Sequence, residues 1–324
     1  MARSTTSDLA STRLDAAGLT PQRLGRIRSR LLEWYDGAPQ GGAMQDFPWR
    51  TARDPYLALV AAVCAQQTQM SRVLEIYARW VEAFPDLETA AAASNAEVLR
   101  VWGRGGYPRR ALAIRDAARI AVEQHGGALP REPEALLALP GVGPFTAAIV
   151  RCFGFGDDAV AVDTNIVRVI GRLVFGDLQP AKETAPRDIE AAAARLLRPG
   201  TAARWNPALM DYGARVCLPR PRCGECVVAS MCAARPRFEA GERAEPVRAQ
   251  RAFDGSDRQW RGRILERLRE SGGPFHVKQL VAALAADEGE AARVRANLEA
   301  LVHEGLAWVE GGRCGLGAAG DGAR

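Results

Sequence analysis

Apolar residues recur at helical spacing along most of the first 235 residues, in short segments separated by glycine and proline. This spacing predicts helices over residues 57–73, 96–101, 114–122, 134–139, 146–153, 164–174 and 189–197. Alternating patterns typical of strands are scarce in the same stretch. We therefore expect an all-helical body over residues 21–235.

Four of the seven cysteines fall within sixteen residues: Cys217, Cys223, Cys226 and Cys232. Of the others, Cys64 and Cys152 lie in apolar helical stretches, where core packing is the simpler role. Such clustering indicates a metal loop in a reducing compartment more than a secreted disulfide framework. Intervals of five, two and five residues fit a zinc site, a disulfide set or an iron–sulfur loop, and the cysteines alone do not choose among them.

The composition is that of an ordinary globular protein with a basic excess. A chain of 324 residues predicts one large domain plus a small one. The net charge is +5, and nearly all basic residues are arginines, whose forked guanidinium suits phosphate oxygens. A compositional bias explains the arginines equally well. Residues 1–20 lack the features of a signal peptide and predict a disordered cytoplasmic tail, and no apolar stretch is long enough to span a membrane.

The C-terminal part changes character after a polar linker predicted over residues 236–255. Residues 256–318 are predicted to form a winged-helix-like α+β domain. Three helical patterns, over 260–269, 277–285 and 291–304, precede a short hairpin over 306–316. A tail is predicted over residues 319–324. The third helix carries Arg293 and Arg295. These arginines fit DNA binding or protein docking, and both roles stay open.

Two further segments contain candidate functional residues. Gly141, Val142 and Gly143 lie between two predicted helices, where glycines allow a tight turn and the next helix offers free N–H groups to a phosphate. The plain alternative is a helix–helix turn. Asp163 follows the apolar residues 159–162 at a predicted helix start. It fits an ordinary N-cap, or a carboxylate that stabilises positive charge developing on a sugar.

Together these motifs resemble those of the helix-hairpin-helix (HhH-GPD) DNA glycosylases. The resemblance rests on residues 139–146 (LPGVGPFT), residues 162–165 (VDTN) and the cysteine loop 217–232. Further segments narrow it to the adenine DNA glycosylase, or MutY, family: 48–50 (PWR), 66–69 (QQTQ), 102–107 (WGRGGY) and 209–214 (LMDYGA). Residues 255–259 (GSDRQ) resemble the tail of actinobacterial members.

The resemblance implies a fold, a cofactor and a partner. The fold is a six-helix barrel domain plus an iron–sulfur helical domain, with DNA in the cleft between them and the target base flipped out. The four clustered cysteines would bind a 4Fe–4S cluster, and zinc is the alternative metal. The first interval, after Cys217, is one residue shorter than the family pattern. The implied partner is double-stranded DNA with a mismatched or damaged base. We expect a monomer in the cytoplasm, associated with the nucleoid, with no membrane partner.

The resemblance also assigns site residues. Asp163 matches the catalytic carboxylate and Asn165 a polar neighbour of it. The residues matched to DNA binding are Gln66, Gln67, Thr68, Arg104, Tyr107, Gly141, Val142 and Gly143.

Two departures from the family pattern concern the base pocket. Ala62 stands where adenine enzymes carry a glutamate that protonates the leaving base, a role worth about a hundred- to ten-thousand-fold in rate. Phe145 stands where lyases carry a lysine, so a Schiff-base step is not expected.

Three functions therefore stay open, in descending order of weight. The first is a monofunctional base-excision glycosylase of MutY type, acting on adenine or on another base (thymine or uracil opposite guanine, or an alkylated purine). The second is a catalytically weak lesion-binding protein. The third is a winged-helix regulator that uses the iron–sulfur body as a redox sensor.

Overall fold

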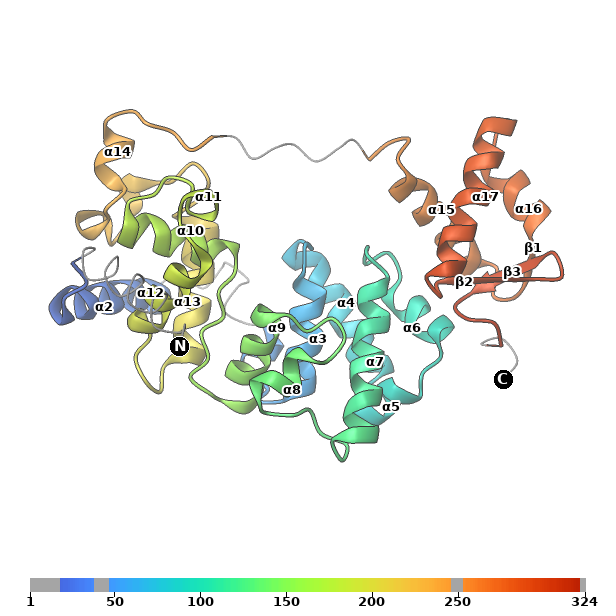
Figure 1. Cartoon of the computed structure of the whole chain (residues 1–324), viewed down its shortest axis with the longest axis horizontal. Helices are drawn as coiled ribbons and strands as arrows, with labels where there is room; N and C mark the ends of the chain where they lie inside the picture. Colours follow the sequence, from blue (N-terminus) through green and yellow to red (C-terminus); the bar gives the residue numbers. More distant parts are fainter. Residues whose placement is uncertain (1–17, 38–46, 246–252, 321–324) are drawn as a thin grey trace, which may run out of the picture. The chain divides into compact units, whose positions relative to one another are not determined.

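The computed structural model describes residues 18–37, 47–245 and 253–320. They form two compact units, and each unit is built from two separate stretches of chain (Figure 1). The first unit comprises Met1–Pro55 and Pro144–Arg248, and the second comprises Tyr56–Gly143 and Ala249–Arg324. The predicted helical body is confirmed.

The first unit is a set of helices around one apolar core. Its longer helices are α2 (Pro21–Gly37), α10 (Thr164–Ile170), α12 (Pro186–Leu196) and α13 (Ala202–Arg215). Its shorter elements are η1 (Pro48–Arg50), α9 (Pro144–Ile149), η2 (Val150–Phe155), η3 (Gly171–Phe175), α11 (Pro180–Glu183), η4 (Cys223–Glu225), η5 (Ala229–Met231) and α14 (Arg235–Glu239).

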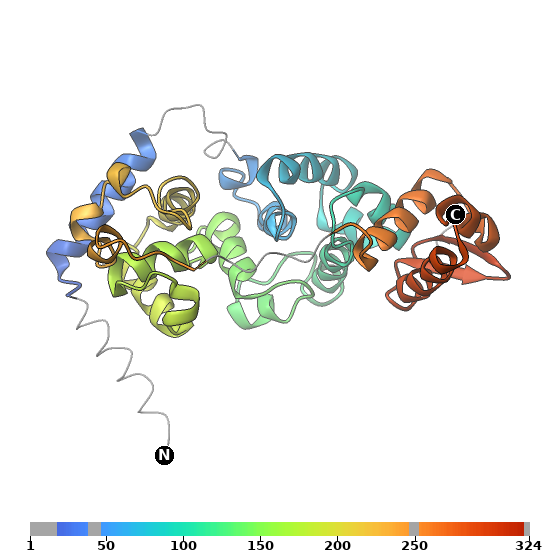
Figure 2. The same cartoon turned by 90° about the horizontal axis from the view of Figure 1, so that it is seen from above.

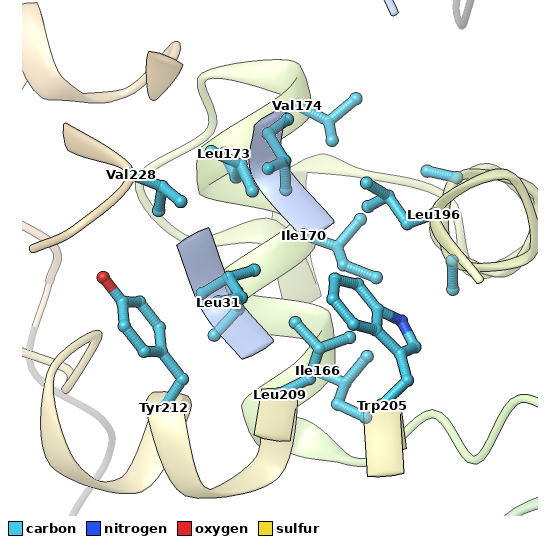
Figure 3. Packing of buried hydrophobic residues seen from close by; sticks show 14 of the residues in the cluster. Leu31, Ile166, Ile170, Leu173, Val174, Leu196, Trp205, Leu209, Tyr212 and Val228 are labelled. Carbon is cyan, nitrogen blue, oxygen red and sulfur yellow. The ribbon is translucent and has the colours of Figure 1, made fainter. Parts of the chain in front are cut away.

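Large side chains of α13 form the centre of this core. Figure 3 shows Trp205 and Tyr212 of α13 among aliphatic side chains from α2, α10 and α12. Both rings are almost completely buried, with 1% of their surface exposed. Burial of each such side chain stabilises the fold by about 2 kcal/mol. This core fixes α10 against α13, and the first residues of α10 belong to the candidate site.

The second unit begins with a helical domain and ends with a small module. The helical domain contains α3 (Pro55–Ala65), α4 (Met70–Ala83), α5 (Leu87–Ala92), α6 (Asn95–Trp102), α7 (Arg109–Gln124) and α8 (Pro133–Leu137). Trp80 and Trp102 pack edge to face with ring centroids 6.0 Å apart. The indole N–H of Trp80 donates to the hydroxyl of Tyr56 at 2.9 Å, and that hydroxyl donates to the carbonyl oxygen of Phe84 at 2.9 Å, so the polar groups of these two buried rings are paired.

The C-terminal module has three helices and a small antiparallel sheet. The helices are α15 (Asp257–Glu270), α16 (Val277–Leu284) and α17 (Glu288–His303). The predicted hairpin is present as β2 (Ala307–Glu310) and β3 (Arg313–Leu316), in register with Val309 opposite Cys314. A third strand, β1 (Phe275–His276), pairs with the other edge of β3. Two residues are too short for an alternating pattern, which is why the sequence did not indicate it.

Several predicted boundaries were wrong. The apolar stretch 57–73 is two helices, because the chain turns after Ala65 and Gln67 takes a left-handed conformation with φ of 51°. The predicted linker 236–255 begins inside the helix α14. The predicted tail 1–20 lies largely outside the described residues, but Leu19 is buried in the core of the first unit. Within the described residues, no helix is both long enough and apolar enough to cross a membrane.

Candidate active site

Asp163 lies at the N-terminus of α10, directly after a buried stretch that includes Ala161. Its Oδ1 accepts a hydrogen bond from the backbone N–H of Ile166 at 2.7 Å, which makes it the N-cap of the helix. Its Oδ2 accepts a second hydrogen bond from the side-chain amide of Asn165 at 3.1 Å. The carboxylate therefore caps the helix and is also oriented by the neighbour that the sequence had paired with it.

Burial raises the pKa of Asp163 above its ordinary value. The N–H groups of Ile166 and Asn165 and the charge of Arg168 act in the opposite direction, and desolvation outweighs them. A carboxylate with little water around it interacts more strongly with a nearby positive charge than a solvated one does. This environment suits a group that stabilises a cation in a reaction.

Arg168, one turn further along α10, connects the site to the cysteine loop. Its guanidinium donates to the side-chain oxygen of Asn165 and to the carbonyl oxygens of Gly213 and Cys217, each at 2.7 Å. Sequence reasoning missed this residue. Its spacing of three from Asn165, which places both side chains on one face of a helix, was the signal that could have found it.

Gly213 of α13 allows α10 to approach closely beside the candidate carboxylate. A Cβ atom at this position would lie 2.6 Å from the Cβ of Asn165 and 3.2 Å from its Cα. Real Cβ atoms do not approach that closely, so any larger residue must displace the start of α10.

We expect Gly213→Ala to displace Asn165, to disturb the orientation of the Asp163 carboxylate and so to slow any reaction that depends on this carboxylate. The strain should also lower the free energy of unfolding by about 1 to 3 kcal/mol. Thermal unfolding and single-turnover rates measure the two effects. Gly25→Ala is the matched control, since Gly25 lies in the helix α2 of the same unit but has open space around its Cα. Equal stability of the two variants would contradict this account.

The four clustered cysteines follow α13 and line one end of the first unit. Cys217, Cys226 and Cys232 pack against the apolar core. The hydroxyl of Tyr212 donates to Sγ of Cys226 at 3.0 Å, and the guanidinium of Arg172 donates to Sγ of Cys217 at 3.7 Å. Burial raises the pKa of the Cys232 thiol to about 11. A metal must therefore displace protons from such thiols in order to bind.

The cysteine loop fits a metal group by residue type. All seven cysteines are free thiols. Among residues 18–37, 47–245 and 253–320, no three Cys, His, Asp or Glu side chains converge as closely as metal ligands do. What the loop offers is four sulfur donors, an apolar backing and two arginines of the α10–η3 segment that hold the loop backbone. Thiolates are the donors that iron–sulfur clusters and structural zinc prefer.

Two loops of the second unit carry residues that the sequence matched to DNA binding. One loop joins α3 to α4 and contains Gln66, Gln67 and Thr68. The other joins α6 to α7 and contains Arg104 and Tyr107. The side chain of Tyr107 is 48% exposed. Gln67 and Tyr107 both have left-handed backbones, with φ of 51° and 44°. Residues without a glycine's freedom hold this conformation only where their surroundings enforce it.

Arg110 of α7 holds these two loops together. Its guanidinium donates to the carbonyl oxygens of Val63, Cys64 and Gln66 and to the hydroxyl of Thr68, all in or before the first loop. It also donates to the carbonyl oxygens of Gly105 and Gly106 in the second loop, at 3.1 and 3.2 Å. The same group stacks over the rings of Trp102 and Tyr107. No motif in the sequence indicated this role.

The glycine-rich turn follows α8. Gly141 has φ of 74°, and a Cβ there would lie 2.8 Å from the Cβ of Ala113, so both the backbone and the packing require glycine. Val142 is buried, whereas Gly141 and Gly143 are exposed. The side-chain amide of Gln66 donates to the carbonyl oxygen of Gly141 at 3.5 Å, which connects the turn with the loop after α3.

The two residues predicted for the base pocket lie in different units. Ala62 is buried within α3 with 4% of its surface exposed, and Phe145 is half-buried on α9. The predicted residues thus form two separate groups, one in each unit. The first unit holds Asp163 next to Asn165, and the second unit holds the two loops around Arg110.

Comparison with known proteins places this arrangement in a family. Residues 60–196 match the family described as HhH-GPD superfamily base excision DNA repair protein. The chain is 38% identical over 278 residues to an adenine DNA glycosylase of Mycolicibacterium smegmatis, and the alignment covers 85% of this chain and 90% of the relative. It is 34% identical over 190 residues to a thymine/uracil-DNA glycosylase of Methanothermobacter thermautotrophicus, over 58% of this chain and 86% of the relative.

The fold also resembles that of a solved DNA glycosylase. A solved thermostable thymine-DNA glycosylase superimposes with a TM-score of 0.60 at 30% identity, over 67% of this chain and 98% of that structure. The chain belongs to the adenine DNA glycosylase (MutY-like) family within the HhH-GPD superfamily of base excision DNA repair proteins.

Proposed function

We propose that the protein is a monofunctional DNA N-glycosylase of base excision repair. The observation that carries this function is the desolvated carboxylate of Asp163, oriented by Asn165 and Ile166. As the bond between the base nitrogen and C1′ breaks, its electron pair leaves with the base and the deoxyribose ring becomes cationic. Asp163 stabilises that cation, and water then adds to C1′ and loses a proton. The products are the free base and an abasic site.

The substrate that we propose is adenine mispaired with 8-oxoguanine or guanine. The similarity to adenine DNA glycosylases over most of the chain supports it. Ala62 has no proton to donate, so another group or water must protonate the leaving base. Phe145 has no amine, which is why we assign hydrolysis without a lyase step.

A panel of duplexes tests the function and the base together. The panel contains adenine opposite 8-oxoguanine or guanine, thymine or uracil opposite guanine, and alkylated purines. We expect abasic product from the adenine duplexes, without strand cleavage. Product only from another duplex would replace the base assignment. Binding without product above an Asp163→Asn control on any duplex would leave a lesion-binding protein.

We propose that Cys217, Cys223, Cys226 and Cys232 hold a 4Fe–4S cluster. Such a cluster would cross-link the loop after α13 through four thiolates. The chain itself contributes Tyr212, which donates to Cys226, and Arg172, which donates to Cys217 and to the carbonyl oxygen of Leu218 at 2.6 Å. These contacts orient two of the four proposed ligands, Cys217 and Cys226.

We expect the purified protein to be brown, and Cys226→Ala to lose the visible absorption band because one ligand is missing. Cys314→Ala is the matched control, since this cysteine is buried in the C-terminal module. Metal analysis accompanies the spectra. A colourless protein that contains zinc would replace the cluster with the alternative metal.

The remaining assignments complete the proposal. The loops around Arg110 and the turn at Gly141 contact DNA, and the partner is a duplex with a mismatched or damaged base. The protein acts as a monomer in the cytoplasm, on the DNA of the nucleoid. None of the seven cysteines, all within the described residues, forms a disulfide, which supports a reducing compartment.

A further inference from the structure

The second unit contains a large groove lined by segments far apart in the sequence. Its volume is about 1050 Å³, and its walls come from the loop between α6 and α7, from α15 and from the segment that precedes α15. Figure 2 shows α15, in orange, next to the helices of the 56–143 segment. The groove therefore joins the C-terminal module to the loop that carries Tyr107.

The lining of this groove is strongly basic. Nine arginines and three glutamates line it, which is an excess of six positive charges. The whole chain has an excess of only five. A general preference for arginine would spread the charge over the surface. The concentration in one groove instead indicates an anionic partner.

One glutamate fixes the geometry of the groove. The carboxylate of Glu266 on α15 accepts from Arg104 of the loop at 2.9 Å and from Arg269 of α15 at 2.7 Å. On the loop side, the carbonyl oxygen of Arg104 accepts from Arg72 at 2.7 Å. The side-chain amide of Asn95 adds a second connection, to the carbonyl oxygen of Gly305 at 2.9 Å. These contacts hold α15 beside the loop and leave other arginines of α15 at the surface.

Arg258 and Arg263 are exposed on α15, and both line the groove. The guanidinium of Arg263 lies over the ring of Trp260 and donates to the carbonyl oxygen of Leu284 at 3.0 Å, which positions it at the groove. Two aromatic side chains on the same lining are also exposed, Tyr107 by 48% and Phe253 by 57%. Arginine forks bind phosphate oxygens, and exposed aromatic rings pack against sugars and bases. A surface of this composition matches nucleic acid better than an acidic peptide, which offers no rings to stack.

We propose that α15 binds the phosphate backbone of DNA and extends the DNA contact of the loop between α6 and α7. The proposal rests on the proposed function in that it takes DNA as the partner. It assigns the C-terminal module a DNA-binding role through its first helix. Arg293 and Arg295 of the third helix do not belong to the lining of the groove. Arg293 donates to the carbonyl oxygen of Gly255 at 3.0 Å, and Arg295 pairs with Glu288 at 3.0 Å.

The test measures affinity of the full-length protein for an undamaged duplex between about 50 and 200 mM salt. We expect the double variant Arg258→Ala, Arg263→Ala to reduce the slope of log K against log salt by about 2, because each lost phosphate contact removes about one counterion. The double variant Arg258→Lys, Arg263→Lys should keep most of the slope, since lysine retains the charge. Should the alanine pair fail to fold, the two single variants carry the test, each with a loss of about 1.

The matched control is the double variant Arg293→Ala, Arg295→Ala, which removes the same charge from α17 of the same module. We expect it to leave the slope unchanged. The proposal would be overturned if the α15 variant kept the parental slope, or if the α17 variant lost as much of the slope as the α15 variant. A groove that binds an acidic protein segment, and not DNA, would leave the slope of the α15 variant unchanged. The duplex carries no lesion, so the slope can be read whether or not the protein excises any base.

Discussion

Asp163→Asn reduces the single-turnover excision rate by about a thousandfold or more, which corresponds to about 4 kcal/mol of transition-state stabilisation. Asparagine is nearly isosteric and is itself a good N-cap, so it keeps the hydrogen bond from Ile166 that starts α10. What it removes is the negative charge that the cationic sugar needs. Measurement of product formation with enzyme in excess over duplex isolates this step from product release.

Two controls separate lost chemistry from lost structure. The affinity of Asp163→Asn for the duplex should equal that of the parent protein. Its melting temperature at neutral pH should be equal or higher, because the folded protein otherwise ionises a carboxyl group in a desolvated position. A variant that melts early, or that still excises at the parental rate, would show that Asp163 is only a helix cap.

The pH dependence has a definite sign. The pKa of Asp163 is raised in the folded protein, and the form that we propose to be active is the carboxylate. Excision should therefore decline as the pH falls through that raised pKa, at a higher pH than an exposed aspartate would give. The free energy of unfolding changes in the opposite sense. The stabilising contribution of the Asp163 carboxyl group is present below the pKa that it has in the unfolded chain, and it is lost as the pH rises through the pKa that it has in the folded protein. Rate and unfolding profiles over the same pH range test both signs.

Arg110→Ala lowers the free energy of unfolding by about 3 kcal/mol, because carbonyl oxygens of two loops lose a charged donor at once. We expect a fall in melting temperature of about 10 °C. Duplex affinity should fall by about tenfold or more as the backbones of Gln67 and Tyr107 relax from their left-handed conformations. Circular dichroism and fluorescence anisotropy measure the two effects.

Variants of neighbouring charge make this test specific. Arg110→Lys keeps a positive charge but has no fork, so it cannot bind both loops and should restore only part of the stability. Arg109→Ala removes an exposed arginine from the preceding position of the same helix and should leave the melting temperature almost unchanged. The same melting temperature for Arg109→Ala and Arg110→Ala would refute the assigned role of Arg110.

The sequence predicted what depends on short patterns. Helical spacing indicated the segments that became α6, α7, α10 and α12, and the apolar approach to Asp163 indicated a helix start with a buried carboxylate. Those signals are local, because they arise from residues within one turn or one cap.

The sequence did not reveal contacts that depend on distant backbone. Arg110 bonds to carbonyl oxygens, which every residue has, so no side-chain pattern marks its partners. The same holds for Arg168, whose acceptors on Gly213 and Cys217 lie 45 and 49 residues away. The split of residues 57–73 was hidden because Gln66 to Gln69 carry no glycine or proline, and the left-handed turn at Gln67 is stabilised by tertiary contacts.

The discontinuity of both units determines when they can fold during synthesis. The first unit needs both α2 and α13, which begins after residue 200, and the second unit joins Tyr56–Gly143 to a module that is synthesised more than 100 residues later. Pairing of such distant segments is slow, because long loops must close first. Nascent chains that carry only α2 to α8 will therefore expose apolar faces until the later segments have been synthesised, and chaperones bind such faces.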